Sequence, residues 1–122
     1  EHGKLRAEMQ CGEAAIDDAA DMVAHDTRLH RLIHECARNP LALSTSASLA
    51  QLAHRARLWT VTFPANGRLT VREHAVIVEA ITARKAQAAE VAMRRHLSRI
   101  ERQLRGAVTE ARERSPSPLA GQ

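Results

Sequence analysis

The 122-residue sequence has very few aromatic side chains: one Phe, one Trp and no Tyr. Proteins that bind single-stranded nucleic acid stack bases on aromatic rings, so this shortage disfavours such binding. The net charge of +4 comes from 18 basic and 14 acidic side chains, which are interleaved along the chain. A surface that binds nucleic acid usually has its basic residues clustered. We therefore expect no direct contact between this chain and DNA.

Cysteines are few, and long apolar runs are lacking. The two cysteines, Cys11 and Cys36, do not have the CxxC spacing of a metal site, which favours a reduced, cytoplasmic protein. Cys36 is expected to be a small buried apolar residue. No apolar run approaches the roughly 18 residues that span a membrane, and no signal peptide is recognisable. Because the sequence begins at Glu1 and not at Met, we expect a fragment of a longer product.

The residues that are abundant are Ala, Leu, Arg and Glu, which are strong helix formers. Only five Gly and four Pro interrupt them, and no apolar residues alternate with period two over a useful length. An all-α domain with a modest core is predicted. We expect this domain to span residues 1–113, and residues 114–122 (RSPSPLAGQ) to be a disordered tail.

The spacing of apolar residues predicts about five helices. The first covers residues 4–11 and ends near Gly12. The second covers residues 13–37 and ends before Asn39-Pro40, because proline cannot continue a helix. The third covers residues 42–62, and a loop at residues 64–67 (PANG) follows it. The predicted core stripe of the third helix consists of Leu49, Leu52, Ala56, Trp59 and Phe63.

The boundary between the last two helices is ambiguous. The fourth helix is predicted to begin at Thr70, which would form a capping box with Glu73. Residues 83–86 (ARKA) include no turn-forming residue, so propensity alone predicts one helix from Thr70 to Arg112. The alternative is a turn near Lys85. One continuous helix would separate residues 74 and 96 by about 33 Å, and the composition does not decide between the two arrangements.

Three histidines and one aspartate interrupt the apolar stripes. Asp26 and His30 are four residues apart and project from consecutive turns, while His74 and His96 occupy the stripes of the last two helices. A carboxylate removed from water must be paired or bound to a cation. Either the four residues bind one metal ion, or they are hydrogen-bonded core residues, with Asp26 paired to His30 or to an arginine.

The other histidines are weaker candidates. His34 lies four residues after His30 and is an alternative ligand, whereas His25 only flanks the stripe. His2 and His54 are predicted to lie at the surface.

The pattern D-x-x-x-H at Asp26 and His30, followed by Asn39-Pro40, Glu73-His74 and R-x-H-L at residues 94–97, resembles the FCD domain. This is the C-terminal, ligand-sensing domain of the FadR subfamily of GntR transcription regulators. The similarity covers roughly residues 5–105, and residues 79–97 (EAITARKAQAAEVAMRRHL) resemble the most recognisable stretch of the family. The sequence departs from the family at Leu29, where an aromatic residue is usual, and at Lys85, where an Asp cap is common.

The resemblance implies an antiparallel helical bundle with a central cavity and a turn near Lys85. It also implies that a divalent ion is bound there by an Asp and three His, which by position are Asp26, His30, His74 and His96. Binding of an effector would shift the last helices and so reset the spacing of DNA-binding domains in a homodimer. The winged-helix domain and the first helix of the family are not found in this sequence, so contact with DNA is expected only through that missing domain.

Three imidazoles and a carboxylate favour a transition metal over Ca²⁺ or Mg²⁺. Zinc is the first candidate, with Ni, Mn, Co and Fe as alternatives, and a small carboxylate effector would complete the coordination. Arg55, Arg57 and Trp59 are candidate effector-binding residues, since arginine can clamp a carboxylate. The alternative is that the arginines are solvated and that Trp59 belongs to the core.

Three functions agree with the sequence. The favoured one is an effector-sensing and dimerising domain of a transcription regulator, which is not an enzyme because no base or nucleophile accompanies the four polar residues. The alternatives are a metal-dependent enzyme on a helical bundle and a metal-free helical interaction module.

Overall fold

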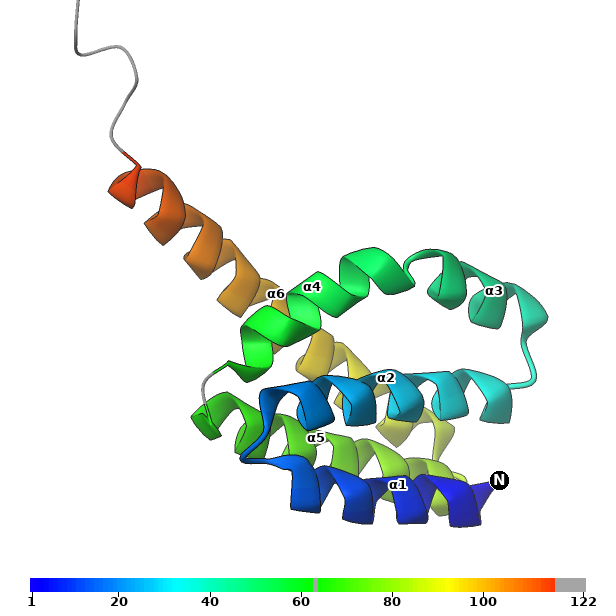
Figure 1. The fold of residues 1–122 in the computed structure, drawn as a ribbon. Coiled ribbons are helices and arrows are strands. Elements are labelled where there is room, and N and C mark those ends of the chain that lie inside the picture. The colour runs from blue at the N-terminus through cyan, green and yellow to red at the C-terminus, as the bar shows by residue number, and fades with distance from the viewer. Residues whose placement is uncertain (63, 116–122) are drawn as a thin grey trace, which may run out of the picture.

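The computed structural model describes residues 1–62 and 64–115, and nearly all of them are helical (Figure 1). The described residues contain no strand, so the all-α prediction is confirmed, with six helices in place of about five. Phe63 and most of the predicted tail lie outside the described residues, although Arg114 is still helical. The helices are α1 (His2–Ala15), α2 (Ala19–Cys36), α3 (Pro40–Ser48), α4 (Ala50–Val61), α5 (Pro64–Thr82) and α6 (Ala86–Arg114).

The helices form a bundle around α2 and α5. Helix α1 packs against both of them, α4 packs against α2, and α6 packs against α5. In Figure 1, α1, α2 and α5 run side by side, and the chain returns over α2 through α3 and α4. The C-terminal part of α6 extends beyond the other helices. The bundle predicted from the family resemblance is therefore present.

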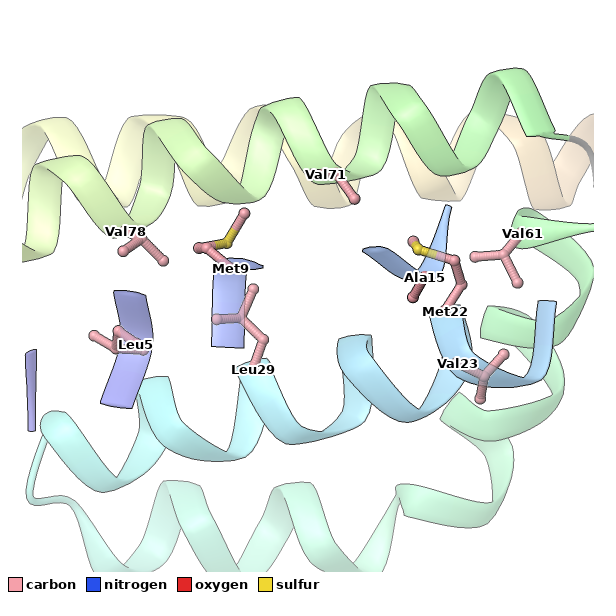
Figure 2. Packing of buried hydrophobic residues seen from close by; sticks show 9 residues of the cluster. All are labelled: Leu5, Met9, Ala15, Met22, Val23, Leu29, Val61, Val71 and Val78. Carbon is pink, nitrogen blue, oxygen red and sulfur yellow. The ribbon is translucent and has the colours of Figure 1, made fainter. Parts of the chain in front are cut away.

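An apolar cluster fills the space between α1, α2 and α5, as Figure 2 shows. Two methionines take part, Met9 and Met22, and their flexible side chains fill gaps between the other apolar residues. Full burial of a Leu, Val or Met side chain stabilises the fold by roughly 1.5–3 kcal/mol. The buried members of the cluster are Leu5, Met9, Ala15, Met22, Val23, Leu29, Val61, Val71 and Val78.

The predicted boundary between the first two helices is wrong. Helix α1 continues through Gly12 to Ala15, and α2 begins at Ala19. The break is fixed by Asp18, whose carboxylate accepts a hydrogen bond of 2.9 Å from the amide of Asp21, as an N-cap does. The apolar spacing was misleading because it continues without change across this break.

The predicted third helix is two helices, α3 and α4, which are separated at Leu49. Helix α3 begins at Pro40, which is tolerated there because the first residue of a helix needs no amide partner. Asn39 caps the helix, since its side chain accepts a hydrogen bond from the amide of Ala42. The predicted core stripe is wrong as well, since Leu52 is 71% exposed and Trp59 is 45% exposed.

The predicted start of the fourth helix is also wrong. The segment at residues 64–67, predicted as a loop, is the first turn of α5. Thr70 and Glu73 consequently lie inside α5 and form no capping box. The turn near Lys85 is confirmed: α5 ends at Thr82 and α6 begins at Ala86, so the continuous helix is excluded.

Candidate metal and effector site

The four residues predicted as metal ligands lie together between three helices. Helix α2 supplies Asp26 and His30, α5 supplies His74, and α6 supplies His96. One nitrogen or oxygen from each of them lies within 4.8 Å of the corresponding atoms of the others. Asp26, His74 and His96 are buried, and His30 is nearly so. We call these four residues the Asp/His cluster.

The α5–α6 hairpin brings two of the four residues, His74 and His96, to the same height along the bundle. His74 lies ten residues before Arg84 in the turn, and His96 lies twelve residues after it. At 1.5 Å per residue, both lie roughly 15–18 Å from the turn along antiparallel helices. The two imidazole rings therefore meet, with their centroids 4.9 Å apart.

Asp26 is surrounded by cationic and imidazole groups. Its Oδ1 lies 3.3 Å from Nε2 of His74 and 3.7 Å from Nε2 of His30, and its Oδ2 accepts a close hydrogen bond from Nε of Arg57. Burial alone would raise the pKa of Asp26. The contact with His74 and the charges of His30 and Arg57 outweigh burial, so the pKa lies well below its ordinary value. The carboxylate is ionised at neutral pH.

Two imidazoles of the cluster, those of His30 and His74, by contrast favour the neutral form. Burial lowers the pKa of His30 to about 4, although the charge of Asp26 opposes this shift. Burial likewise lowers the pKa of His74 against the same opposing charge. Neutral imidazole is the form that ligates a metal, so the lone pairs of these rings are available at neutral pH.

The donor set fits a divalent transition metal. His74 Nε2 is buried and has no hydrogen-bond partner among the described residues, although Asp26 Oδ1 lies 3.3 Å away. Ligand atoms about 2 Å from one ion lie within about 4 Å of each other, so the observed spread of 4.8 Å requires only a small contraction. One carboxylate and three imidazoles are typical ligands of such ions.

A carboxylate from α5 orients His96. Glu73 Oε2 lies 2.6 Å from His96 Nδ1, and both Glu73 oxygens accept hydrogen bonds of 2.7 Å from Arg99. Burial alone would raise the pKa of Glu73, but the bonds from Arg99 and His96 lower it below its ordinary value. Arg99 also donates to Thr70, and the predicted capping pair thus takes part in a network behind His96.

Sequence reasoning missed two buried residues beside the cluster, His25 and Glu8. His25 Nδ1 lies 3.0 Å from Glu8 Oε1, and His25 Nε2 lies 3.3 Å from His74 Nδ1. The signal was present in the sequence. His25 lies between Met22 and Leu29 at helical spacing, and Glu8 lies three residues after Leu5 and next to Met9, which are both buried in α1.

The three candidate effector-binding residues are placed very differently. Arg57 lines a cavity of about 170 Å³ beside the Asp/His cluster, whereas Arg55 is exposed on the same helix. Trp59 is 45% exposed and does not line this cavity. The lining residues are Asp26, His30, Ala53, Ala56, Arg57, Thr60, Thr70, His96, Leu97 and Ile100.

The remaining histidines stay outside the cluster. His34 is half-buried and is not a member of it, and His54 is exposed, as predicted. His2 is half-buried, which differs from the predicted surface position. Cys36 is partly buried and packs against the apolar core.

A comparison with protein families matches residues 2–99 to the FCD domain. The chain belongs to the FCD domain family. Such domains are the effector-binding domains of GntR-type transcription regulators and are generally not enzymes. Comparison of this FCD domain with curated proteins and with solved structures gives no match. Among the described residues, no helix is both long enough and apolar enough to cross a membrane.

Proposed function

We propose that this FCD domain binds one divalent transition metal ion through Asp26, His30, His74 and His96, and that the bound ion recruits a small carboxylate effector. The observation that carries the proposal is the convergence of one ionised carboxylate and three imidazoles in the buried centre of the bundle. Zinc is the first candidate, and Ni, Mn, Co or Fe(II) would accept the same donors.

Each residue of the proposed site would have a separate role. Asp26 supplies the negative charge that offsets the ion, and Arg57 and Glu73 hold Asp26 and His96 in place. When bound, the ion supplies a Lewis-acidic position for an anionic ligand. Among the described residues that line the cavity, there is no base other than the proposed ligands, so we propose ligand sensing and not catalysis.

The cavity restricts the size of the effector. Its volume of about 170 Å³ is well below the roughly 300–1,000 Å³ of pockets for drug-sized ligands. A carboxylate with only a few carbon atoms would fit. Arg57 is the cationic side chain of the lining, and arginine recognises carboxylates through paired hydrogen bonds.

Two matched variants test the effector. In the zinc-loaded protein, short mono- and dicarboxylates should raise the melting temperature, and after chelation the same acids should have no effect. Arg57→Gln should abolish the rise, whereas Arg55→Gln, two residues away on the same helix and exposed, should retain it. A rise of equal size in chelated protein, or in Arg57→Gln, would show that the acids bind elsewhere.

The cavity also connects the effector to the rest of the regulator. Residues of both α4 and α6 line it, so a ligand bound there would change the packing of these helices. We propose that this change reaches a DNA-binding domain elsewhere in the regulator, in a cytoplasmic homodimer of FadR-type organisation. Exposed apolar side chains on one face of α6 (Leu97 and Val108) favour dimerisation. A monomer mass in sedimentation equilibrium, or identical helix packing with and without effector, would contradict this part.

A further inference from the structure

His25 is a fully buried imidazole with a partner on each ring nitrogen. Its Nδ1 lies 3.0 Å from Glu8 Oε1, and its Nε2 lies 3.3 Å from His74 Nδ1. Glu8 is also bound by Arg28 at 3.0 Å. Three side chains therefore connect α1 to the centre of the bundle in one line: Glu8, His25 and His74.

The direction of the hydrogen bonds along this line follows from Glu8, the residue at its outer end. A carboxylate paired with arginine only accepts hydrogen bonds, so His25 must carry its proton on Nδ1 to donate to Glu8. His25 Nε2 then faces His74 Nδ1 as the acceptor, so that His74 carries its proton on Nδ1. His74 Nε2 is left with a lone pair that faces Asp26 Oδ1 at 3.3 Å. With no proton on Nε2, these two acceptors would repel each other at this distance, and a cation between them would relieve the repulsion.

We propose that Glu8 and His25 are positioning residues for the metal site, which fix His74 in the tautomer that presents Nε2 to the ion. This inference rests on the metal binding proposed above. The second ring nitrogen of a ligating histidine commonly donates to a carboxylate or carbonyl, which orients the ring. Glu73 does this directly for His96 at 2.6 Å, and His25 transmits the same effect from Glu8 to His74.

Gly12 provides the space for this arrangement. A Cβ atom at Gly12 would lie 2.5 Å from Cε1 and Nε2 of His25. The His25 ring therefore packs directly against the backbone of α1, and Nε2 cannot move closer to this helix without a shift of the helix itself. Helix α1 supplies both the carboxylate and the gap that hold His25 in place.

A pair of substitutions at one position separates positioning from packing. His25→Leu retains an apolar side chain but removes the acceptor for His74 Nδ1, and we expect zinc affinity to fall about 10–100-fold. His25→Gln keeps an acceptor near the position of Nε2 and should recover part of that loss. His34→Leu, a change to a half-buried histidine of the same helix outside the cluster, should leave zinc affinity unchanged. If His25 only fills space, Leu will bind zinc as tightly as the parent, and Gln will be the weaker variant.

The wild-type protein gives a second measurement that does not depend on how the variants fold. In ¹⁵N NMR spectra of the zinc-loaded protein, His25 should carry its proton on Nδ1 and His74 should be protonated on Nδ1 and metal-bound through Nε2. His25 protonated on Nε2 would overturn the proposal while leaving the metal site intact. Absence of zinc binding by the parent protein would instead contradict the proposed function and this inference with it.

Discussion

Gly12 shows how strongly the site depends on single residues. It is a helical glycine with negative φ, so its backbone conformation does not require glycine. What requires glycine is the His25 ring, which occupies the place of a Cβ atom. The ring is fully buried and held at both nitrogens, and so it has little freedom to yield.

Gly12→Ala should therefore destabilise the fold by about 1–3 kcal/mol, the cost of overpacking a filled interior. Gly106 in α6 is the matched control, because nothing lies within 4 Å of a Cβ built there. Gly106→Ala should stabilise the protein by about 0.5–1 kcal/mol, since Gly is a poor helix former. Urea unfolding of both variants measures the difference. Equal changes of the same sign would mean that His25 does not pack against Gly12 as described.

For single residues, the sequence was informative about the Asp/His cluster but not about the side chains that surround the cluster. Asp26 and His74 stand out because a polar side chain in an apolar stripe needs a partner. Nothing in the local sequence distinguishes Arg57 from Arg55, because which of them faces the cavity depends on how α4 is turned after the break at Leu49. Leu49 carries no recognisable helix-breaking signal.

Among the elements, the hairpin of α5 and α6 determines whether a site exists. Its turn has the hydrogen bonds of a Schellman motif: Lys85 N donates to Ala80 O at 2.9 Å and Arg84 N donates to Ile81 O at 3.0 Å. Arg84 has a φ of +57°, in the left-handed region that usually favours glycine. Propensity could not predict this turn, because arginine is a good helix former and gives no sign of such a conformation.

Arg84→Gly should stabilise the protein by up to about 1 kcal/mol, because relief of the left-handed strain exceeds the added entropy of the unfolded chain. Arg102→Gly, a change at an exposed position within α6, should cost about 1 kcal/mol. Thermal unfolding of both proteins provides the test. A loss of stability in Arg84→Gly would contradict the assignment of a left-handed residue in this turn.

The whole molecule combines a small apolar core with a buried polar layer. The polar layer contains Glu8, His25, Asp26, His74 and His96, which must be hydrogen-bonded or bound to an ion if burial is not to cost free energy. The family resemblance predicted this bundle correctly, because the order of its polar residues carries more information than local propensity. Helix boundaries were less predictable, since apolar spacing continues across the break at residues 16–18.

Metal should therefore influence the stability of the entire bundle. An ion that binds only the folded state at a concentration about 100-fold above Kd adds about 2.7 kcal/mol. For a domain of this size, that should raise Tm by about 10 °C. Calorimetry of zinc-loaded and chelator-treated protein measures the difference, and equal Tm values would favour a metal-free helical module.

The most direct measurement of the central claim is the zinc content of the purified, zinc-loaded and dialysed protein. The wild-type protein and His54→Ala, a change at an exposed histidine, should each retain about one zinc per chain. His74→Ala and Asp26→Ala should retain less than about one tenth of that amount, since each removes a ligand. A wild-type protein without zinc, or a His74→Ala variant with full zinc content, would contradict the account.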